Sequence, residues 1–576
     1  MILQALSDYY RRKSAIPENR LAQPGFEWKG IDFVLLIDTN GVLIDIQDNR
    51  EQQGAKRIAH RHLVPQGVKK TSGIAANLLW DNAEYVLGLV QKGKPERTRQ
   101  AHNAFIERIQ KELPIDSDGG VAAVVYFLQS LDLDTLDRFA AWDELKLSKG
   151  NISFKLQNDS GLVCQRDAVI DAVKSAWTDA DGDKQQFCLI SGQRYEPERL
   201  HPSIKGVWGA QSSGANIVSF NLDAFNSYGK EQGFNAPVGK FAVFTYTTAL
   251  NHLLERDSRQ RLQVGDASTV FWAEKESPFE DDFLEIFREP VKGDDPDRNT
   301  QKVRALYKAV ESGGYTPDDN TTRFYVLGLA PNAARIAVRF WQVATVTELS
   351  QRIVCHFEDL KIVHHPKEPP YPSLFRLLVH TATQGKADNI TPSLGGELIR
   401  AVLSGGLYPH SLLQTAIRRN RAERNIDYYR AALIKAVLNR QNRIHHHMEK
   451  EITVALDPDN THIGYRLGRL FAVLEKIQQE TQGDINATIR DKFYGAASSS
   501  PLSVFSNLMK LKNHHLAKLD RPGRVNQFEK LIGEILDDVK TFPAQMPLQD
   551  QGLFAIGYYH QRQDFFKPKQ TEKKGE

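Results

Sequence analysis

Apolar residues follow two different spacings along the chain, and the change of spacing divides it into halves. Before about residue 345, short apolar runs with strand-like spacing alternate with helical segments. From about residue 348 onward, apolar residues recur almost throughout at the i, i+3, i+4 spacing of helices, with proline-containing breaks between segments. The pattern predicts an α+β protein: a mixed α/β N-terminal region with antiparallel β-hairpins, followed by an all-α C-terminal helical bundle.

The N-terminal half contains individual elements that its spacing predicts. Helices are expected over residues 2–13, 98–112, 121–131, 134–143 and 240–254. Strands are expected over residues 152–156, 187–190, 217–220, 324–329 and 336–341. Acidic loops that contain Pro and Gly separate some of these pieces and are the predicted linkers, at 289–299 and 313–320.

One segment of this half, residues 33–46, reads FVLLIDTNGVLIDI, with two apolar runs on either side of Asn40-Gly41. This dipeptide tolerates the positive φ angles of a type I′ turn, so the segment predicts a β-hairpin. It also resembles the first motif of haloacid-dehalogenase-like phosphatases, in which Asp38 would be the nucleophile. Asn40 stands where that family has its general acid and cannot donate a proton as a carboxylic acid does. The hairpin is therefore the favoured interpretation.

Composition narrows the class of protein. The chain has 576 residues and a net charge of +3, and its apolar and charged fractions are ordinary for a soluble globular protein. That length suffices for roughly three to four domains. Cys164, Cys188 and Cys355 lie far apart and cannot make a disulfide framework, so free thiols in a reducing cytosol are expected.

The chain start and the apolar runs bear on location. The segment MILQALSDYYRRKS has no apolar core followed by a cleavage site, so we expect no signal peptide. No apolar run approaches the ~20 residues that span a bilayer. We therefore expect a cytoplasmic protein with no membrane partner.

Candidate metal and phosphate motifs are weak. Three adjacent histidines, 445–447, point in different directions on a helix and do not make one tetrahedral site. The glycine-rich run GVWGAQSSGA lacks the Gly-Lys-Ser/Thr ending of a phosphate-binding loop. We therefore expect no metal and no cofactor.

Two polar loops and one basic segment are the better candidates for binding. Gln211, Ser212, Ser213 and Asn216 can each donate and accept hydrogen bonds, as DNA contacts require, although a plain loop next to a buried strand explains them too. Lys69 and Lys70, with Ser72 and Asn77 beyond them, have the same character, and a solvated loop is an equal alternative. Residues 418–443 contain eight Lys or Arg opposed only by Glu423 and Asp427. Such a nearly single-signed helix favours contact with nucleic acid or with an acidic partner.

Several long motifs stand together in one order along the chain. They are WDNAEYVLGL, HPSIKGVWGAQSSGANIVSFN, SYGKEQGFNAPV, FTYTTALNHLL, FYVLGLAPNAARIAVRFW, GGELIRAVLSGGLYP, YYRAALIKAVLNR, YRLGRLFAVLEKIQ, NATIRDKFYGAASSSP and GLFAIGYYHQRQDFF. Together they resemble the large subunit of the type I-C CRISPR surveillance complex, Cascade. The resemblance covers almost the whole chain and is weakest over residues 95–185.

The resemblance implies a subunit without catalytic activity. Such a subunit lies beside the one that holds the 5′ end of the guide RNA, together with the backbone repeat subunit and the small subunits. Its N-terminal part recognises the protospacer-adjacent motif (PAM) in double-stranded target DNA and promotes duplex opening and R-loop formation. Base pairing with the CRISPR guide RNA reads the remaining sequence. A separate helicase-nuclease is then recruited.

The resemblance also implies three parts and a second product. The parts are residues 1–345 for PAM recognition and contact with the guide 5′-end subunit, a helical region 346–447, and a bundle 448–576 like the small subunit. Type I-C loci can make that small subunit by internal translation, and Met448 is a hypothetical start for it.

These arguments nominate two sets of site residues. Those expected at the PAM and duplex are Lys69, Lys70, Ser72, Asn77, Gln211, Ser212, Ser213 and Asn216. Those expected along a nucleic-acid backbone are Arg418, Arg419, Arg421, Arg424, Arg430, Arg440, Arg443, Arg466 and Arg469. Two rival functions remain open, a metal-dependent nuclease or phosphatase and a purely structural scaffold of the complex.

Overall fold

A computed structural model describes most of the chain. The described residues are 1–16, 21–54, 56–68, 73–91, 94–178, 185–289, 297–316, 318–446, 448, 450–483, 487–537 and 539–567. Two compact units divide the chain. Unit 1 comprises residues 1–204 and 216–252, and unit 2 comprises residues 205–215 and 253–576.

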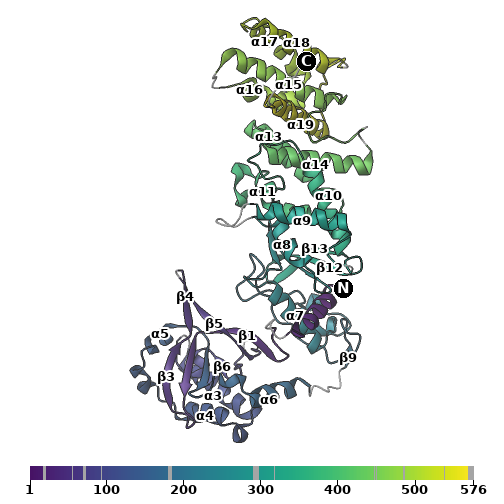
Figure 1. Cartoon of the computed structure of the whole chain (residues 1–576). Helices are drawn as coiled ribbons and strands as arrows, with labels where there is room; N and C mark the ends of the chain where they lie inside the picture. The colour runs from purple at the N-terminus through teal and green to yellow at the C-terminus, as the bar shows by residue number, and fades with distance from the viewer. Residues whose placement is uncertain are drawn as a thin grey trace, which may run out of the picture. The chain divides into compact units, whose positions relative to one another are not determined.

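Unit 1 is built on two antiparallel-rich sheets and a small hairpin (Figure 1). The four-stranded sheet has the order β3-β2-β7-β6, in which β2 and β7 are parallel. The three-stranded sheet has the order β1-β5-β4. The strands are β1 (Phe26–Ile31), β2 (Phe33–Ile37), β3 (Leu43–Asp48), β4 (Arg50–Gln53), β5 (Lys56–Pro65), β6 (Trp80–Asp81), β7 (Ile152–Leu156), β8 (Gln186–Phe187) and β9 (Arg194–Tyr195).

Helices cover the four-stranded sheet of unit 1 and close its core. The α-helices of this unit are α1 (Ile2–Ser14), α2 (Ala83–Val86), α3 (Pro95–Glu112), α4 (Gly119–Ser130), α5 (Trp142–Leu147), α6 (Asp167–Thr178) and α7 (Lys240–Leu253). Phe154 of β7 lies between Phe105 of α3 and Phe127 of α4, with ring centroids 6.4 and 6.1 Å away. Burial of such apolar surface stabilises the unit by roughly 25 cal/mol per Å². A second contact joins the two ends of the unit, because Tyr10 of α1 packs edge-on against Phe244 of α7.

The hairpin at Asn40-Gly41 is confirmed, but its predicted turn type is wrong. β2 and β3 pair antiparallel, and the Gly41 N–H donates to the Asp38 carbonyl. Gly41 has a φ of 79°, whereas Asn40 is not left-handed, and a type I′ turn needs both. The Asp38 carboxylate accepts the N–H groups of Val42 and Asn40, and these bonds lower the pKa of Asp38. Asp38 therefore caps a turn, which is a structural role.

Unit 2 begins with a four-stranded antiparallel sheet of order β10-β11-β12-β13. Its strands are β10 (Arg261–Val264), β11 (Ala267–Ala273), β12 (Arg323–Asn332) and β13 (Arg335–Thr345). The spacing of apolar residues predicted β12 and β13 correctly. One face of this sheet contributes Phe271, Phe324 and Phe340 to the large apolar core of the unit.

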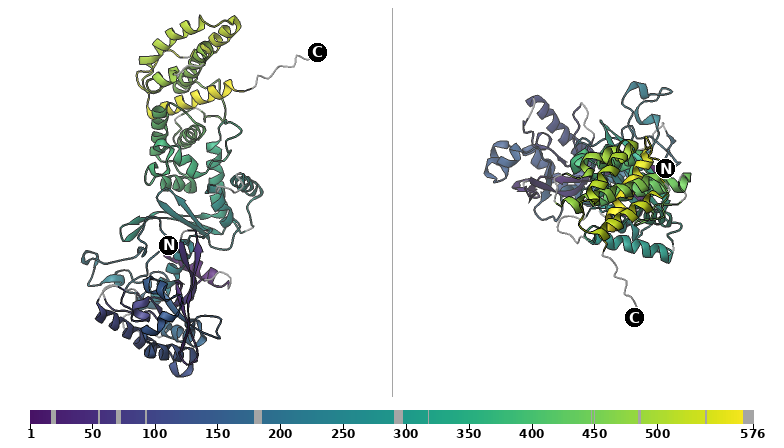
Figure 2. Two further views of the ribbon diagram at one scale, coloured as in Figure 1. Left: turned by 90° about the vertical axis from the view of Figure 1, so that its left-hand side faces the viewer. Right: turned by 90° about the horizontal axis from the view of Figure 1, so that it is seen from above.

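The rest of unit 2 is helical, as the apolar spacing predicted (Figures 1 and 2). Thr345 and Glu348 start the first long helix after the sheet with a reciprocal capping box. The α-helices are α8 (Phe279–Phe287), α9 (Arg298–Ser312), α10 (Val346–Leu360), α11 (Leu374–Val379), α12 (Leu394–Ser404), α13 (His410–Glu423), α14 (Tyr428–His445), α15 (Ile463–Gln482), α16 (Ile489–Ser499), α17 (Leu502–Leu516), α18 (Pro522–Leu536) and α19 (Leu548–Phe565). An α+β fold is therefore confirmed.

Three predicted elements of the N-terminal half are corrected. Residues 217–220 form no strand, because the β-branched run Ile217–Val218 has no partner strand to pair with. The strand expected over residues 187–190 is only the two-residue β8. The helix expected over residues 134–143 is a short 3₁₀ turn that ends where Phe139 is extended, and α5 starts afterwards.

Two glycine contacts hold the C-terminal helices close together. A Cβ on Gly468 of α15 would overlap the Phe554 carbonyl oxygen of α19, and one on Gly557 of α19 would overlap the Tyr465 carbonyl oxygen. The helices α15 and α19 therefore approach with their backbones in contact, which only glycine permits. Among the helices of the described residues, none is both long and apolar enough to cross a bilayer.

Two buried histidines of unit 2 are hydrogen-bonded to tyrosines. The Tyr408 hydroxyl lies 2.7 Å from His356 Nδ1, and the Tyr465 hydroxyl lies 2.9 Å from His560 Nδ1. Burial, with the nearby charges of Arg440 and Lys435 respectively, lowers the pKa of each histidine to about 3. Both imidazoles are therefore neutral in the folded protein at neutral pH.

These histidines should make unit 2 sensitive to acid. An unfolded histidine titrates near pH ~6.5, so below that pH the unfolded chain binds protons that the folded chain does not. Stability should fall as the pH drops from about 6.5 toward 3, by about 2 kcal/mol per histidine at about pH 5. Urea unfolding near pH 7 and near pH 5 measures this. His356→Gln should reduce the loss, whereas His410→Gln, at an exposed position, should not. Equal pH dependence in all three proteins would contradict the assignment.

Candidate nucleic-acid interface

The polar segment 205–215 of unit 2 forms two consecutive turns whose backbone is fixed. The Ala210 N–H donates to the Val207 carbonyl, and the Gly214 N–H donates to the Gln211 carbonyl at 2.9 Å. The Trp208 N–H donates to Ser268 Oγ in β11, which attaches the turns to the sheet of unit 2. Gly209 and Gly214 have positive φ angles of 76° and 91°, so glycine is required at these corners.

Gln211, Ser212 and Ser213 lie at the outer side of these turns. All three are exposed, and their side chains have no hydrogen bond within the described part of the chain. Three polar side chains on a fixed backbone, open to solvent, can present donors and acceptors to a ligand at low entropic cost. The neighbouring Trp208 is also exposed, at 66%.

Two other nominated polar residues have internal roles. Asn216, in unit 1, donates from Nδ2 to the His201 carbonyl at 2.8 Å. Asn77 is 5% exposed, and its Oδ1 accepts the Val68 N–H at 3.0 Å. Asn77 thereby joins the two sides of the loop that contains Lys69, Lys70 and Ser72. Those three residues lie outside the described residues.

The base of this loop is firmly attached to unit 1. The Gly67 N–H donates to Glu27 Oε1, and the Trp80 indole donates to the Pro65 carbonyl at 2.8 Å. Arg108 of α3 donates to the Ala76 carbonyl. Asn77 therefore helps to position the loop. Because its side chain is buried and bonded internally, we do not propose that Asn77 reads a base edge.

The basic segment 418–443 divides into an exposed and a buried part. Arg418, Arg421 and Arg424, at the end of α13, are exposed, and within the described residues they have no ion pair. Arg419 is paired with Glu423 and also donates to Thr383 Oγ1. The end of α13 thus offers three cations to solvent, which suits contact with phosphates.

Helix α14 carries the buried part. Arg430 is 4% exposed and ion-paired with Asp427 at 2.6 Å and with Glu423 at 2.7 Å. Arg440 is 3% exposed and donates two hydrogen bonds to Asp359 Oδ2 of α10, at 2.9 and 2.6 Å. Neither guanidinium is available for a nucleic-acid backbone, because each already bonds within the fold.

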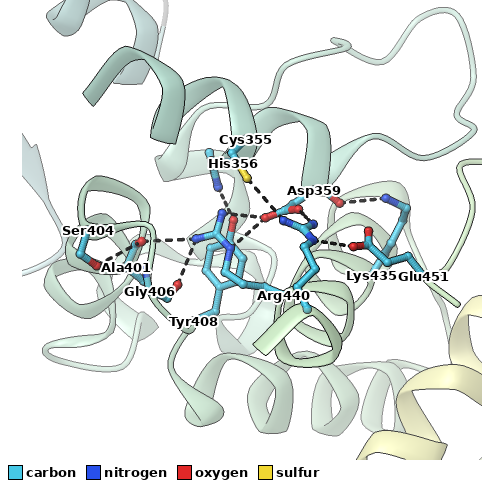
Figure 3. Close-up of polar contacts among 11 residues, drawn as sticks. Cys355, His356, Asp359, Ala401, Ser404, Gly406, Tyr408, Lys435, Arg440 and Glu451 are labelled. Atoms are coloured by element: carbon cyan, nitrogen blue, oxygen red, sulfur yellow. Dashed lines mark hydrogen bonds and ion pairs between the residues drawn. The ribbon is translucent and has the colours of Figure 1, made fainter. Parts of the chain in front are cut away.

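Figure 3 shows the polar contacts that the Arg440 guanidinium makes within the fold. Its Nη1 donates to the carbonyls of Ala401 and Gly406, and its guanidinium carbon lies 4.1 Å from the centre of the Tyr408 ring. The Lys435 ammonium donates to the Asp359 carbonyl at 3.0 Å, and burial lowers the pKa of Lys435. Lys435 and Arg440 of α14 are therefore bonded to α10, and Arg440 is also bonded to the end of α12. These bonds hold the three helices together.

Arg443 extends the same cluster to the surface. Its guanidinium contacts the second oxygen of Asp359 and pairs with Glu451 at 2.6 Å. The hydrogen bonds to Asp359 and Glu451 raise the pKa of Arg443 despite the opposing effect of burial. Arg443 thus has a structural role as well.

The two arginines nominated in α15 are also buried. Arg466 donates from Nε to the Asn460 carbonyl at 3.0 Å. Arg469 is 3% exposed and donates to Gln561 Oε1 and to the Pro458 carbonyl. Their burial removes both from the proposed backbone track.

Sequence reasoning missed two exposed features of unit 1. The strand β5 presents His60 and Arg61 to solvent. A turn at Tyr228-Gly229 presents a fully exposed aromatic ring. The consecutive basic residues His60-Arg61-His62 of β5 and the Tyr-Gly pair in an asparagine-rich segment are the signals that could have indicated them.

The described residues contain no group of three or more His, Cys, Asp or Glu side chains arranged to hold a metal ion.

A model of the family described as "CRISPR-associated protein (Cas_Csd1)" matches residues 6–566. No curated protein matches the chain significantly.

Proposed function

Because the chain belongs to the Cas_Csd1 family of type I-C large subunits and so acts within Cascade with other Cas subunits, we propose that it recognises the PAM in duplex DNA. In this proposal it has no catalytic activity of its own. It promotes duplex opening and R-loop formation by the guide RNA complex, and it helps to recruit the helicase-nuclease. Base pairing with the guide then supplies the remaining specificity.

The exposed turn at Gln211, Ser212 and Ser213 carries this proposal. Reading a base requires side-chain donors and acceptors that face outward on a fixed backbone, and this turn supplies them. Arg418, Arg421 and Arg424 support it, because exposed cations can follow phosphates independently of sequence. Lys69, Lys70 and Ser72 remain proposed contacts on the duplex side.

Gln211→Ala should reduce discrimination at one position of the motif. If Gln211 bonds a base edge, its loss should cost roughly 1–3 kcal/mol for the preferred motif and little for an altered one. The measurement is the dissociation constant of the assembled, guide-loaded complex for duplexes with the motif and with each single-base change. Gln351→Ala, an exposed glutamine on α10, is the matched control and should leave every constant unchanged.

Two outcomes would contradict this reading. Equal binding of motif and altered duplexes by the wild-type complex would overturn PAM recognition and leave the scaffold alternative. A Gln211→Ala effect of the same size on all duplexes would show that Gln211 does not read a base.

The C-terminal helices supply the second part of the proposal. A product that begins at Met448 would start after α14 ends at His445 and would contain α15 to α19 whole. We therefore retain residues 448–576 as the small-subunit-like part. An immunoblot should lose a short C-terminal product in a Met448→Leu strain, and its persistence would eliminate this start.

A further inference from the structure

A hairpin turn in unit 1 presents an aromatic ring that the fold itself does not use. The Lys230 N–H donates to the Ser227 carbonyl at 2.9 Å, and these two residues form an antiparallel bridge. Both central residues are left-handed, Tyr228 with φ 52° and Gly229 with φ 67°. This is type I′ geometry, whose first central position favours Asn, Asp or Gly. A tyrosine there strains the backbone.

The Asn235 amide keeps the turn in this conformation. Its Oδ1 accepts the Ser227 N–H at 3.0 Å, and its Nδ2 donates to the carbonyls of Lys230 and Gln232 at 3.0 and 3.1 Å. The adjacent Gly233 donates its N–H to the Arg199 carbonyl and approaches that backbone so closely that a Cβ could not fit. The turn is thus fixed at both ends and attached to the segment 198–199.

Burial of the Tyr228 side chain does not offset this strain. It is 99% exposed, and a Cβ placed on its neighbour Gly229 would meet no atom within 4 Å. Strain at an exposed residue persists only where the surroundings impose it, and it concentrates at functional sites. The observation therefore calls for a partner that contacts the ring.

We propose that Tyr228 stacks on a base of the target DNA that is exposed as the duplex opens. This inference rests on the proposed function and assigns a residue to it. Every base has a π-face, so an aromatic ring can stack on it without reading its identity. A rigid turn is suited to this, because apolar or aromatic side chains that enter a duplex must hold their position against the base stack.

The charges around the turn favour a base over a phosphate. The exposed charged residues of segment 221–231 are Asp223, Lys230 and Glu231, which give no positive excess. Phosphate contacts depend on such an excess, whereas stacking does not. This segment has two acidic residues and one basic residue, so its exposed ring is better suited to stacking than to a phosphate contact.

Tyr228→Ala should weaken binding of a guide-matched duplex by the assembled complex roughly 5- to 150-fold. Tyr228→Phe and Tyr228→Trp should bind nearly as well as the wild type, because both keep an aromatic face. Tyr126→Ala, which removes another exposed tyrosine of unit 1, should have no effect. A 2-aminopurine base placed next to the motif should be quenched less by Tyr228→Ala than by the wild type.

Tyr228→Asn separates binding from folding. Asparagine tolerates the left-handed conformation, so this variant should unfold at the same or a higher temperature than the wild type and still bind DNA weakly. Lost binding could not then be attributed to misfolding.

The outcomes distinguish this inference from the function on which it rests. Normal DNA binding by Tyr228→Ala, in a complex whose wild type still prefers motif duplexes, would overturn the stacking role alone. Loss of a Cas subunit from the Tyr228→Ala complex in size-exclusion chromatography would overturn it in favour of a protein contact. A wild-type complex without motif preference would instead overturn the proposed function.

Discussion

Asp359→Ala should lower the free energy of unfolding of the α10–α14 region by about 3–5 kcal/mol. The substitution leaves the buried Arg440 guanidinium without its anion, and Arg443 loses its bond to the same carboxylate. An unpaired buried cation loses its Coulombic partner but keeps its desolvation cost. Native-state hydrogen exchange of the amides of α10 and α14 measures the effect.

Two further variants make the Asp359 test specific. Glu534→Ala breaks an exposed pair with Lys530 and should change stability by less than about 1 kcal/mol. Asp359→Leu combined with Arg440→Met removes both buried charges and should recover much of the loss. An Asp359→Ala protein with normal exchange protection in both helices would show that the cluster contributes little to stability.

Gly468→Ala should destabilise the contact between α15 and α19 by about 3 kcal/mol or more. The added methyl group would meet the Phe554 carbonyl oxygen and the Tyr558 nitrogen, which are backbone atoms and cannot rotate away. The two helices must separate, and this loosens the packing around Phe471 and Phe554. Hydrogen exchange in α15 and α19 should rise while exchange in unit 1 stays unchanged.

Gly533→Ala is the matched control for this glycine. Gly533 is an exposed residue within α18, and a Cβ there would meet no atom within 4 Å. Alanine should therefore stabilise that helix by up to about 1 kcal/mol, because it is the better helix former. A destabilised Gly533→Ala protein, or an unaffected Gly468→Ala protein, would contradict the close-contact explanation.

The fold was predictable where local spacing determines which residues are buried. Helix α7 and the strands β12 and β13 follow directly from their apolar positions. Residues 217–220 show the limit of this reasoning, because a strand also needs a partner whose position depends on distant parts of the chain. The predicted type of the turn at Gly41 was wrong for a related reason, because hydrogen bonds to the Asp38 carboxylate select the geometry of that turn.

The candidate site was predictable only in part. The exposed turn at Gln211 follows from its glycine and serine content. The basic residues of α14 did not show that Arg440 is buried, because the carboxylate that neutralises Arg440 comes from Asp359, 81 positions away in the chain. A charge pattern along one helix cannot reveal a partner on another, so the buried arginines could not be separated from the exposed ones by sequence alone.

The glycine contact between α15 and α19 has a consequence for protein synthesis. The helix that α15 touches most closely is the last of the described helices, and residues of α16, α17 and α18 separate the two in the chain. While the ribosome is still producing those residues, the glycine face of α15 lacks the α19 backbone, and the Tyr465 hydroxyl lacks its bond to His560. The contact between α15 and α19 can form only after α19 leaves the exit tunnel, so the surface of α15 that α19 covers stays exposed until then.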